Sequence, residues 1–178
     1  VSSGVRPGHK KAFVRGNNSL SVFNPTLRKD WFRPCITAKS ITKWSGNSTE
    51  LSLLYIPNTI DTLPKEIEES LLPFKDKLSV RAEAKKNGKW FTLRPCSYYH
   101  LFNKPKILFP NICASSRFSL DTKGQFVLDG AFFIDSDNLA LLGVLNSDIV
   151  WDYFIDHCSS IGNARNKGRL RLKKSHVE

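Results

Sequence analysis

The stretch from residue 104 to residue 154 constrains the fold of this chain more than any other, because its hydrophobic periodicity changes along its length. Its first part contains short runs of β-prone residues at 107–109, 117–120, 125–128 and 131–134. Asp121-Thr122-Lys123-Gly124 separates two of these runs and has a glycine where a turn requires a positive φ. The pattern predicts a hairpin between the runs 117–120 and 125–128, followed by a further strand.

After residue 134 the period of the apolar residues becomes helical. They then recur at helical spacings, at Leu139, Leu142, Leu145, Ile149, Val150, Tyr153 and Phe154. Asn146-Ser147-Asp148 interrupts this pattern, and these residue types compete for backbone hydrogen bonds and cap helices. We therefore expect one or two helices, broken at this point, that pack on the preceding sheet.

The rest of the chain adds strands and one long helical region. Further strands are predicted at 12–15, 51–56, 89–94 and 169–173. The helical region is 62–86, and Pro73 in its interior must kink it or divide it into two helices. These elements predict an α+β fold in a single domain, residues 1–178, with a mixed, mostly antiparallel sheet and two or three packed helices.

The net charge favours a polyanionic partner. The chain has 27 Lys and Arg against 16 Asp and Glu, a formal charge of +11. Residues 1–43 carry nine basic side chains and one acidic one, and residues 159–178 carry six and one, whereas residues 117–158 carry two and seven. If the two basic ends of the chain meet in the fold, they form one basic surface that faces away from the acidic helices. The alternative is a charge that only makes the protein soluble.

Three basic segments are candidates for nucleic-acid binding, each with a plainer alternative. The first, at the tip of an N-terminal loop, contains Arg6, His9, Lys10 and Lys11, which suit a phosphate backbone or a solvated loop equally. Residues 28–44 mix aromatic and basic side chains, as in a base-stacking surface or in a strand with its Trp inside. In 169–173, period-two alternation places Leu170 and Leu172 on one face and basic residues on the other. This pattern is typical of a DNA-binding strand and also of an edge strand protected by charge.

Cysteine and hydropathy patterns argue against a metal site and a membrane span. The four cysteines, at 35, 96, 113 and 158, lack zinc-ligand spacing and are expected to be buried thiols in a reducing cytoplasm. No apolar run approaches the roughly 20 residues of a membrane span, and no signal peptide is recognised. The sequence contains no methionine, and we expect it to be a piece of a longer protein.

The order of several segments resembles that of the TaqI-like specificity domain, the target recognition domain of bacterial adenine-N6 DNA methyltransferases and of fused restriction-modification enzymes. The segments that carry the resemblance are 4–14, 32–34 with 39–44, 71–81 with 90–93, 104–154 and 168–174. They cover nearly the whole chain. Where the family has Thr-Gly and Asn near its start, this chain has Pro7-Gly8 and Lys10, so roles that depend on that hydroxyl or amide do not transfer.

The resemblance implies a module that reads double-stranded DNA for an S-adenosylmethionine-dependent adenine methyltransferase, in a restriction-modification or phage-defence system. The chain itself lacks an Asn-Pro-Pro-Tyr-like motif and a cofactor fingerprint, so the catalytic domain and its cofactor are expected in the parent chain. The residues expected to contact phosphates are Arg6, Lys10, Lys11, Lys39, Lys43, Arg165, Lys167 and Arg169, and His9 is a further DNA-binding candidate. Those expected to read bases are Arg94, Tyr98, His100, Lys123 and Asn166.

Two other functions stay open. The chain can be a non-catalytic structural or subunit-interface module whose charge is incidental. It can also be a nuclease or RNA-processing domain, for which Asp76 and Glu83-Ala84-Lys85 offer a superficial D…E-x-K pattern. The residues of such a nuclease site lie on adjacent strands, whereas these are predicted on a helix, which disfavours this hypothesis.

Overall fold

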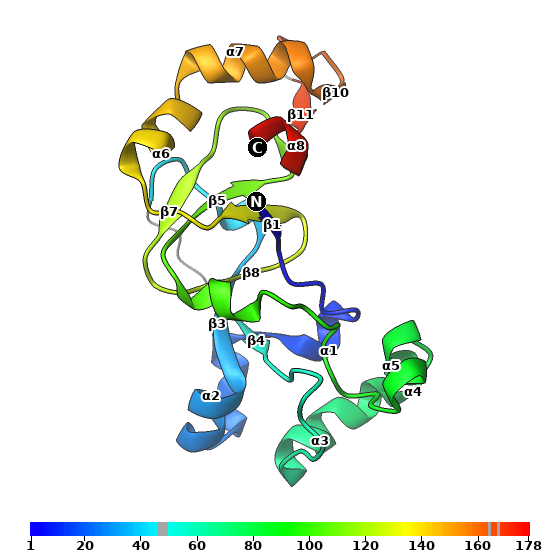
Figure 1. The fold of residues 1–178 in the computed structure, drawn as a ribbon. Coiled ribbons are helices and arrows are strands. Elements are labelled where there is room, and N and C mark those ends of the chain that lie inside the picture. Colours follow the sequence, from blue (N-terminus) through cyan, green and yellow to red (C-terminus); the bar gives the residue numbers. More distant parts are fainter. Residues whose placement is uncertain (46–49, 164, 167) are drawn as a thin grey trace. The chain divides into compact units, whose positions relative to one another are not determined.

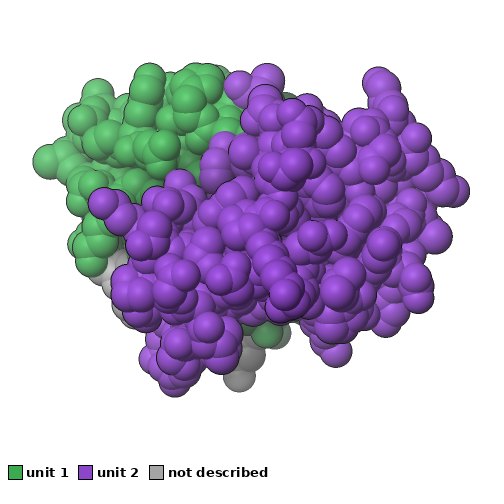
Figure 2. Space-filling model, turned by 90° about the horizontal axis from the view of Figure 1, so that it is seen from below, with its two compact units in different colours: residues 1–4, 36–49, 98–178 green, residues 5–35, 50–97 purple. Residues whose placement is uncertain are grey.

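The computed structural model describes residues 1–45, 50–163, 165–166 and 168–178. Within these ranges it confirms an α+β fold whose sheets are mostly antiparallel (Figure 1). The chain forms two compact units, coloured separately in Figure 2. Unit 1 comprises Val1–Gly4, Ile36–Thr49 and Tyr98–Glu178, and unit 2 comprises Val5–Cys35 and Glu50–Ser97.

The central sheet of unit 1 has the order β1-β9-β5-β7 and is antiparallel throughout. Its strands are β1 (Ser2–Ser3), β9 (Ala131–Ile134), β5 (Lys106–Pro110) and β7 (Ser119–Asp121). All of β5 is buried, as expected for a strand with a partner on each side and side chains packed on both faces. The predicted strands at 107–109 and 131–134 are therefore confirmed.

A second antiparallel sheet of unit 1 has the order β10-β11-β6. Its strands are β10 (Ser159–Ile161), β11 (Arg169–Arg171) and β6 (Ile112–Cys113). Leu170 of β11 is fully buried whereas Arg169 and Arg171 are exposed, so the predicted alternation is correct. The alternative of an edge strand is wrong, because β11 lies between two partners.

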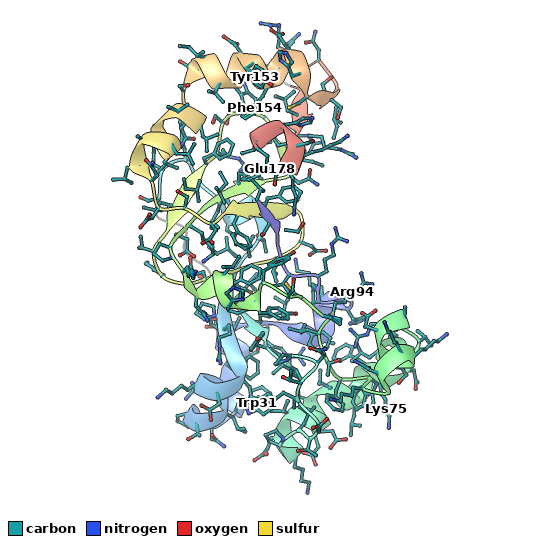
Figure 3. The ribbon with its side chains drawn as sticks, in the orientation of Figure 1. Trp31, Lys75, Arg94, Tyr153, Phe154 and Glu178 are labelled. Carbon is teal, nitrogen blue, oxygen red and sulfur yellow. The ribbon has the colours of Figure 1, made fainter. Side chains whose placement is uncertain are left out.

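Two helices of unit 1, α6 (Leu139–Leu145) and α7 (Asp148–His157), are separated at the predicted break. The other helices are η2 (Ala38–Ser40), η4 (Tyr99–Asn103) and α8 (Lys174–Val177). The short strand β8 (Phe126–Val127) also belongs to this unit. The side chain of Asn138 caps α6 and that of Ser147 caps α7. The neighbours Tyr153 and Phe154 on α7 (Figure 3) divide between surface and core, being 51% and 1% exposed.

The first and last residues of the chain also meet in unit 1. The amino group of Val1 lies 3.2 Å from a carboxylate oxygen of Glu178, which is labelled in Figure 3. Val1 and Val177 pack against the same buried core as Phe109 and Phe154.

Unit 2 contains three antiparallel strands in the order β2-β4-β3 and a series of short helices. The chain divides at Pro73, as the sequence predicted, and its first helix, α3, begins after Pro64. The strands are β2 (Val14–Gly16), β4 (Leu51–Leu54) and β3 (Phe32–Ile36). The helices are α1 (Lys10–Phe13), η1 (Asn17–Val22), α2 (Pro25–Trp31), α3 (Lys65–Leu71), η3 (Leu72–Phe74), α4 (Lys75–Ser79) and α5 (Ala82–Asn87).

The predicted hairpin around Asp121-Thr122-Lys123-Gly124 is wrong, although Gly124 does adopt a positive φ of 68°. β7 pairs with β5, and β8 lies outside that sheet. The reason is a buried ion pair. The Asp121 carboxylate accepts hydrogen bonds from Lys106 Nζ at 2.6 Å and from the amides of Lys123 and Gln125, each at 2.9 Å. The turn therefore folds around its own aspartate.

Two further predictions are corrected in unit 2. Only the second half of the strand predicted at 12–15 is a strand, because Ala12 and Phe13 end α1 and β2 begins at Val14. The strand predicted at 89–94 is absent from the described structure. The carbonyl oxygens of Trp90 and Thr92 accept hydrogen bonds from the Arg81 guanidinium, at 2.7 and 2.9 Å, where a strand would use them in a ladder.

Candidate nucleic-acid interface

A basic pocket of about 510 Å³ opens on the surface of unit 1. Lys39 comes to it from η2, Arg117 from the segment before β7, and Arg169 from the exposed face of β11. β11 pairs with β6 in a register that sets Leu170 opposite Cys113, which brings Arg169 to the pocket beside the end of β6. The remaining lining residues are Ala38, Ile112, Cys113, Ala114 and Ser115.

The three cations of this pocket have no intramolecular partner among the residues that the structure describes. Other arginines are engaged: Arg165 Nη2 lies 2.7 Å from the Asp156 carboxylate, for example. None of the lining residues in the described part of the chain is acidic. Burial raises the pKa of the Cys113 thiol to about 11, although the positive charge of Arg117 acts to lower it. This lining thiol is therefore neutral at pH 7 and adds no negative charge to the pocket. The pocket thus presents unneutralised positive charge, which attracts anions.

Buried hydrogen bonds fix the backbone on both sides of Arg117. Asn146, which is 2% exposed, accepts from the Phe118 amide at 3.1 Å and donates to the Phe118 carbonyl at 2.8 Å. The Ser116 hydroxyl donates to the Leu145 carbonyl at 2.7 Å and contacts Asn146 Oδ1 at 3.3 Å. The helix break at Asn146 therefore has a second role, because it clamps the segment that carries Arg117.

Trp44 is joined to the same segment. Its amide donates to the Phe118 carbonyl at 2.9 Å and its carbonyl accepts from the Leu120 amide at 2.7 Å. Trp44 has a φ of 77°, a strained conformation for an aromatic residue, and its side chain is 49% exposed with the Lys43 ammonium 5.2 Å from its ring centroid. An exposed aromatic ring with a lysine beside it suits stacking on a nucleobase.

A known enzyme contains this fold. The chain superimposes on part of the Type IIL restriction-modification enzyme MmeI, whose structure was determined in complex with DNA, with a TM-score of 0.63 and 15% sequence identity. The match covers 99% of this chain and 24% of MmeI, so the chain spans about a quarter of that protein's length. At this identity the likeness concerns the fold alone. No family model matches the sequence.

Of the residues predicted to bind DNA, the structure brings Lys39 and Arg169 together in the basic pocket. The other predicted residues of unit 1 that the structure describes lie outside its lining. Tyr98 belongs to an aromatic cluster, with its ring 6.2 Å from those of Phe102 and Phe133. The remaining predicted residues that the structure describes in unit 1 are Lys43, His100, Lys123, Arg165 and Asn166, and Lys167 lies outside the described residues.

The predicted residues of unit 2 lie near the start of the chain and before β5. Arg6, Lys10 and Lys11 are exposed, whereas the His9 ring packs against Phe74 at a centroid distance of 5.2 Å. Arg94 (Figure 3), predicted to read a base, donates from Nε to Glu83 Oε1 at 2.9 Å. Burial by itself would raise the pKa of Glu83, but a backbone hydrogen bond and the nearby Arg94 and Arg81 lower it below its usual value.

Sequence reasoning missed Arg117 and Asn146. Arg117 stands in the otherwise acidic part of the chain, and that isolation was the available signal. Asn146 was recognised as a helix break, but its contact with Phe118 joins residues that are 28 positions apart. A pattern in a single sequence does not reveal such a contact.

Among the described residues, no cluster of three or more His, Cys, Asp or Glu side chains is placed to hold a metal ion. In the same part of the chain, no helix combines the length and the apolar character that crossing a membrane requires.

Proposed function

We propose that this chain is a DNA-recognition module of a restriction-modification enzyme and that its basic pocket holds the phosphate backbone of a duplex. The observation that carries the proposal is the convergence of Lys39, Arg117 and Arg169 on one pocket without an acidic partner. The fold shared with part of MmeI, an enzyme whose structure was determined with DNA, supports the proposal.

The finer proposal is that the module directs an S-adenosylmethionine-dependent adenine-N6 methyltransferase to its target sequence. Its support is the resemblance of the ordered segments to the TaqI-like specificity domain. This chain lacks the Asn-Pro-Pro-Tyr-like motif that such an enzyme uses for the flipped adenine, so its residues do not build the methyl-transfer site. The parent chain would bind the cofactor and perform the chemistry, and this chain would supply position and specificity.

Fluorescence anisotropy with a labelled duplex, repeated over a series of salt concentrations, tests the DNA-binding proposal. Each phosphate contact contributes about 0.9 to the slope of log affinity against log salt. Replacing Lys39, Arg117 and Arg169 together by Ala should therefore lower that slope by up to about 2.7.

A matched control separates local contacts from net charge. Lys77, Lys85 and Lys86 are exposed on α4 and α5, and replacing them by Ala removes the same charge. This control should leave the slope near that of the original protein. Equal slopes for the pocket variant and the control would remove the pocket from the DNA interface.

The same titration distinguishes the alternative functions. A structural or subunit-interface module should show no salt-sensitive binding to duplex DNA. Tighter binding to RNA than to the duplex of the same sequence, or metal-dependent cleavage of either, would indicate an RNA-processing or nuclease domain.

A further inference from the structure

We infer that Arg117 is the specificity-determining residue of the basic pocket, that it reads a guanine, and that Asn146 is the residue that positions it. The inference rests on the proposed function, because it assumes that the pocket faces a DNA duplex. Lys39 and Arg169 are assigned to phosphates, and with two phosphate contacts the slope change of the triple variant becomes about 1.8 rather than the upper limit of about 2.7. The three cations of one pocket thus have different tasks.

The first argument is the degree to which each cation is held. Lys39 and Arg169 are exposed, and their long side chains can follow a phosphate over several positions. Arg117 is half-buried. Its neighbours Ser116 and Phe118 are buried, at 7% and 0% exposed, so the backbone at Arg117 has little freedom. Arg169 also stands on a fixed backbone, because β11 pairs with a strand on each side, but its side chain extends into solvent. Of the three side chains only that of Arg117 is partly buried, which restricts the directions in which it can present its donors to a base edge.

The second argument is the source of that rigidity. Asn146 bonds both the amide and the carbonyl of Phe118 and also contacts the Ser116 hydroxyl. The amide side chain of Asn146 thus uses both its oxygen and its nitrogen to hold the two residues that flank Arg117. Trp44 adds two backbone hydrogen bonds, in which its amide donates to the Phe118 carbonyl and its carbonyl accepts from the Leu120 amide. Asn146 and Trp44 therefore both hold the segment that carries Arg117, and the Arg117 side chain forms part of the pocket lining.

The third argument is chemical. A guanidinium offers paired donors in a planar fork, and guanine presents two acceptors, O6 and N7, on its major-groove edge. Among the described residues that line the pocket there is no carboxylate to accept from a cytosine amino group and no Asn or Gln to pair with adenine. The base edge that best matches the pocket is that of guanine.

Selection of bound duplexes from a randomised library tests the inference. The original protein should select a consensus that contains at least one guanine dependent on Arg117. Because Gln pairs with adenine as Arg pairs with guanine, Arg117→Gln should replace that guanine by adenine or abolish the preference. The loss of discrimination at this position should be about 5- to 150-fold.

Arg169→Gln is the matched control, since it makes the same substitution at a cation of the same pocket. It should weaken binding to all sequences alike and leave the consensus unchanged. An unchanged consensus for Arg117→Gln, or a changed base for Arg169→Gln, would overturn the assignment of Arg117.

The positioning role of Asn146 has its own readout. Asn146→Leu removes both hydrogen bonds to Phe118 without adding a charge, so Arg117 keeps its charge but loses its support. This variant should blunt the preference for guanine at the Arg117 position while the salt slope stays that of the original protein. An intact preference in a variant confirmed to be folded by circular dichroism would refute the role of Asn146.

The outcomes also separate the inference from the proposed function. If the original protein shows no salt-sensitive binding and selects no sequence, the proposed function fails. If it selects a sequence that Arg117→Gln leaves unaltered, only the inference fails.

Discussion

At the scale of single residues, buried cations organise both units. Arg81, 9% exposed in unit 2, donates from Nε to the Leu78 carbonyl at 3.0 Å and from Nη2 to the Trp90 and Thr92 carbonyls. Its guanidinium also lies 5.5 Å from the ring centroid of Phe13. In unit 1, Lys106 is fully buried against Asp121. Burial lowers the pKa of Lys106 below its usual value, although the neighbouring Asp121 carboxylate acts in the opposite direction. Lys106 likewise donates to backbone carbonyl oxygens, those of Phe102 and Lys104, at 2.6 and 3.2 Å.

Replacing Arg81 by Met should lower the free energy of unfolding by about 3 kcal/mol, because it leaves buried carbonyl groups without donors. Urea denaturation followed by circular dichroism measures the change. Arg28→Met on the exposed side of α2 is the control and should change stability by less than about 0.5 kcal/mol. Similar losses in the two variants would contradict the structural role of Arg81.

At the scale of elements, the sequence predicted those whose signals are local. The helices before and after Ser147, the division at Pro73 and the alternation in β11 each follow from residues within a few positions of one another. The errors come from contacts between distant positions. The carbonyls of Trp90 and Thr92 bond Arg81 instead of a neighbouring strand. The Asp121 carboxylate bonds Lys106 of β5, and β7 pairs with β5 instead of forming the predicted hairpin. In the candidate site, Lys39 and Arg169 were found by charge, but their convergence with Arg117 depends on the register of β11 with β6.

The cap of α6 gives a prediction at this scale. Asn138 Oδ1 accepts hydrogen bonds from the amides of Ala140 and Leu141, at 2.9 and 3.1 Å. Asn138→Ala should therefore cost about 1 kcal/mol of stability. Asn138→Asp retains the accepting oxygen and should match the original protein, since a negative charge is also favourable at a helix start. Thermal unfolding of the three proteins measures the difference, and an equal loss for Asp and Ala would rule out the capping role.

At the scale of the whole molecule, the basic residues of the two chain ends fall into different units. Lys10 and Lys11 belong to unit 2, whereas Lys39 and Arg169 belong to unit 1. The sequence predicts that the two basic ends form one surface, and this stays a prediction.

Acetylation of lysines with and without bound duplex tests that prediction. If both basic segments bind the same DNA, the duplex should slow acetylation of Lys10, Lys11 and Lys39, as read by mass spectrometry of peptides. Lys77 and Lys86, exposed on α4 and α5, should react equally in both conditions. Protection of Lys39 alone would show that the N-terminal lysines do not share its surface.

The position of Asn146 has a consequence for how this chain can change. One side chain stands at the end of α6 and also holds the backbone beside the basic pocket, so a substitution there acts on a helix and on a surface at the same time. A variant that alters the pocket through Arg117 leaves this support in place, whereas one that alters Asn146 does not. Changes in what the pocket binds therefore cost less stability at the cation than at the residue behind it.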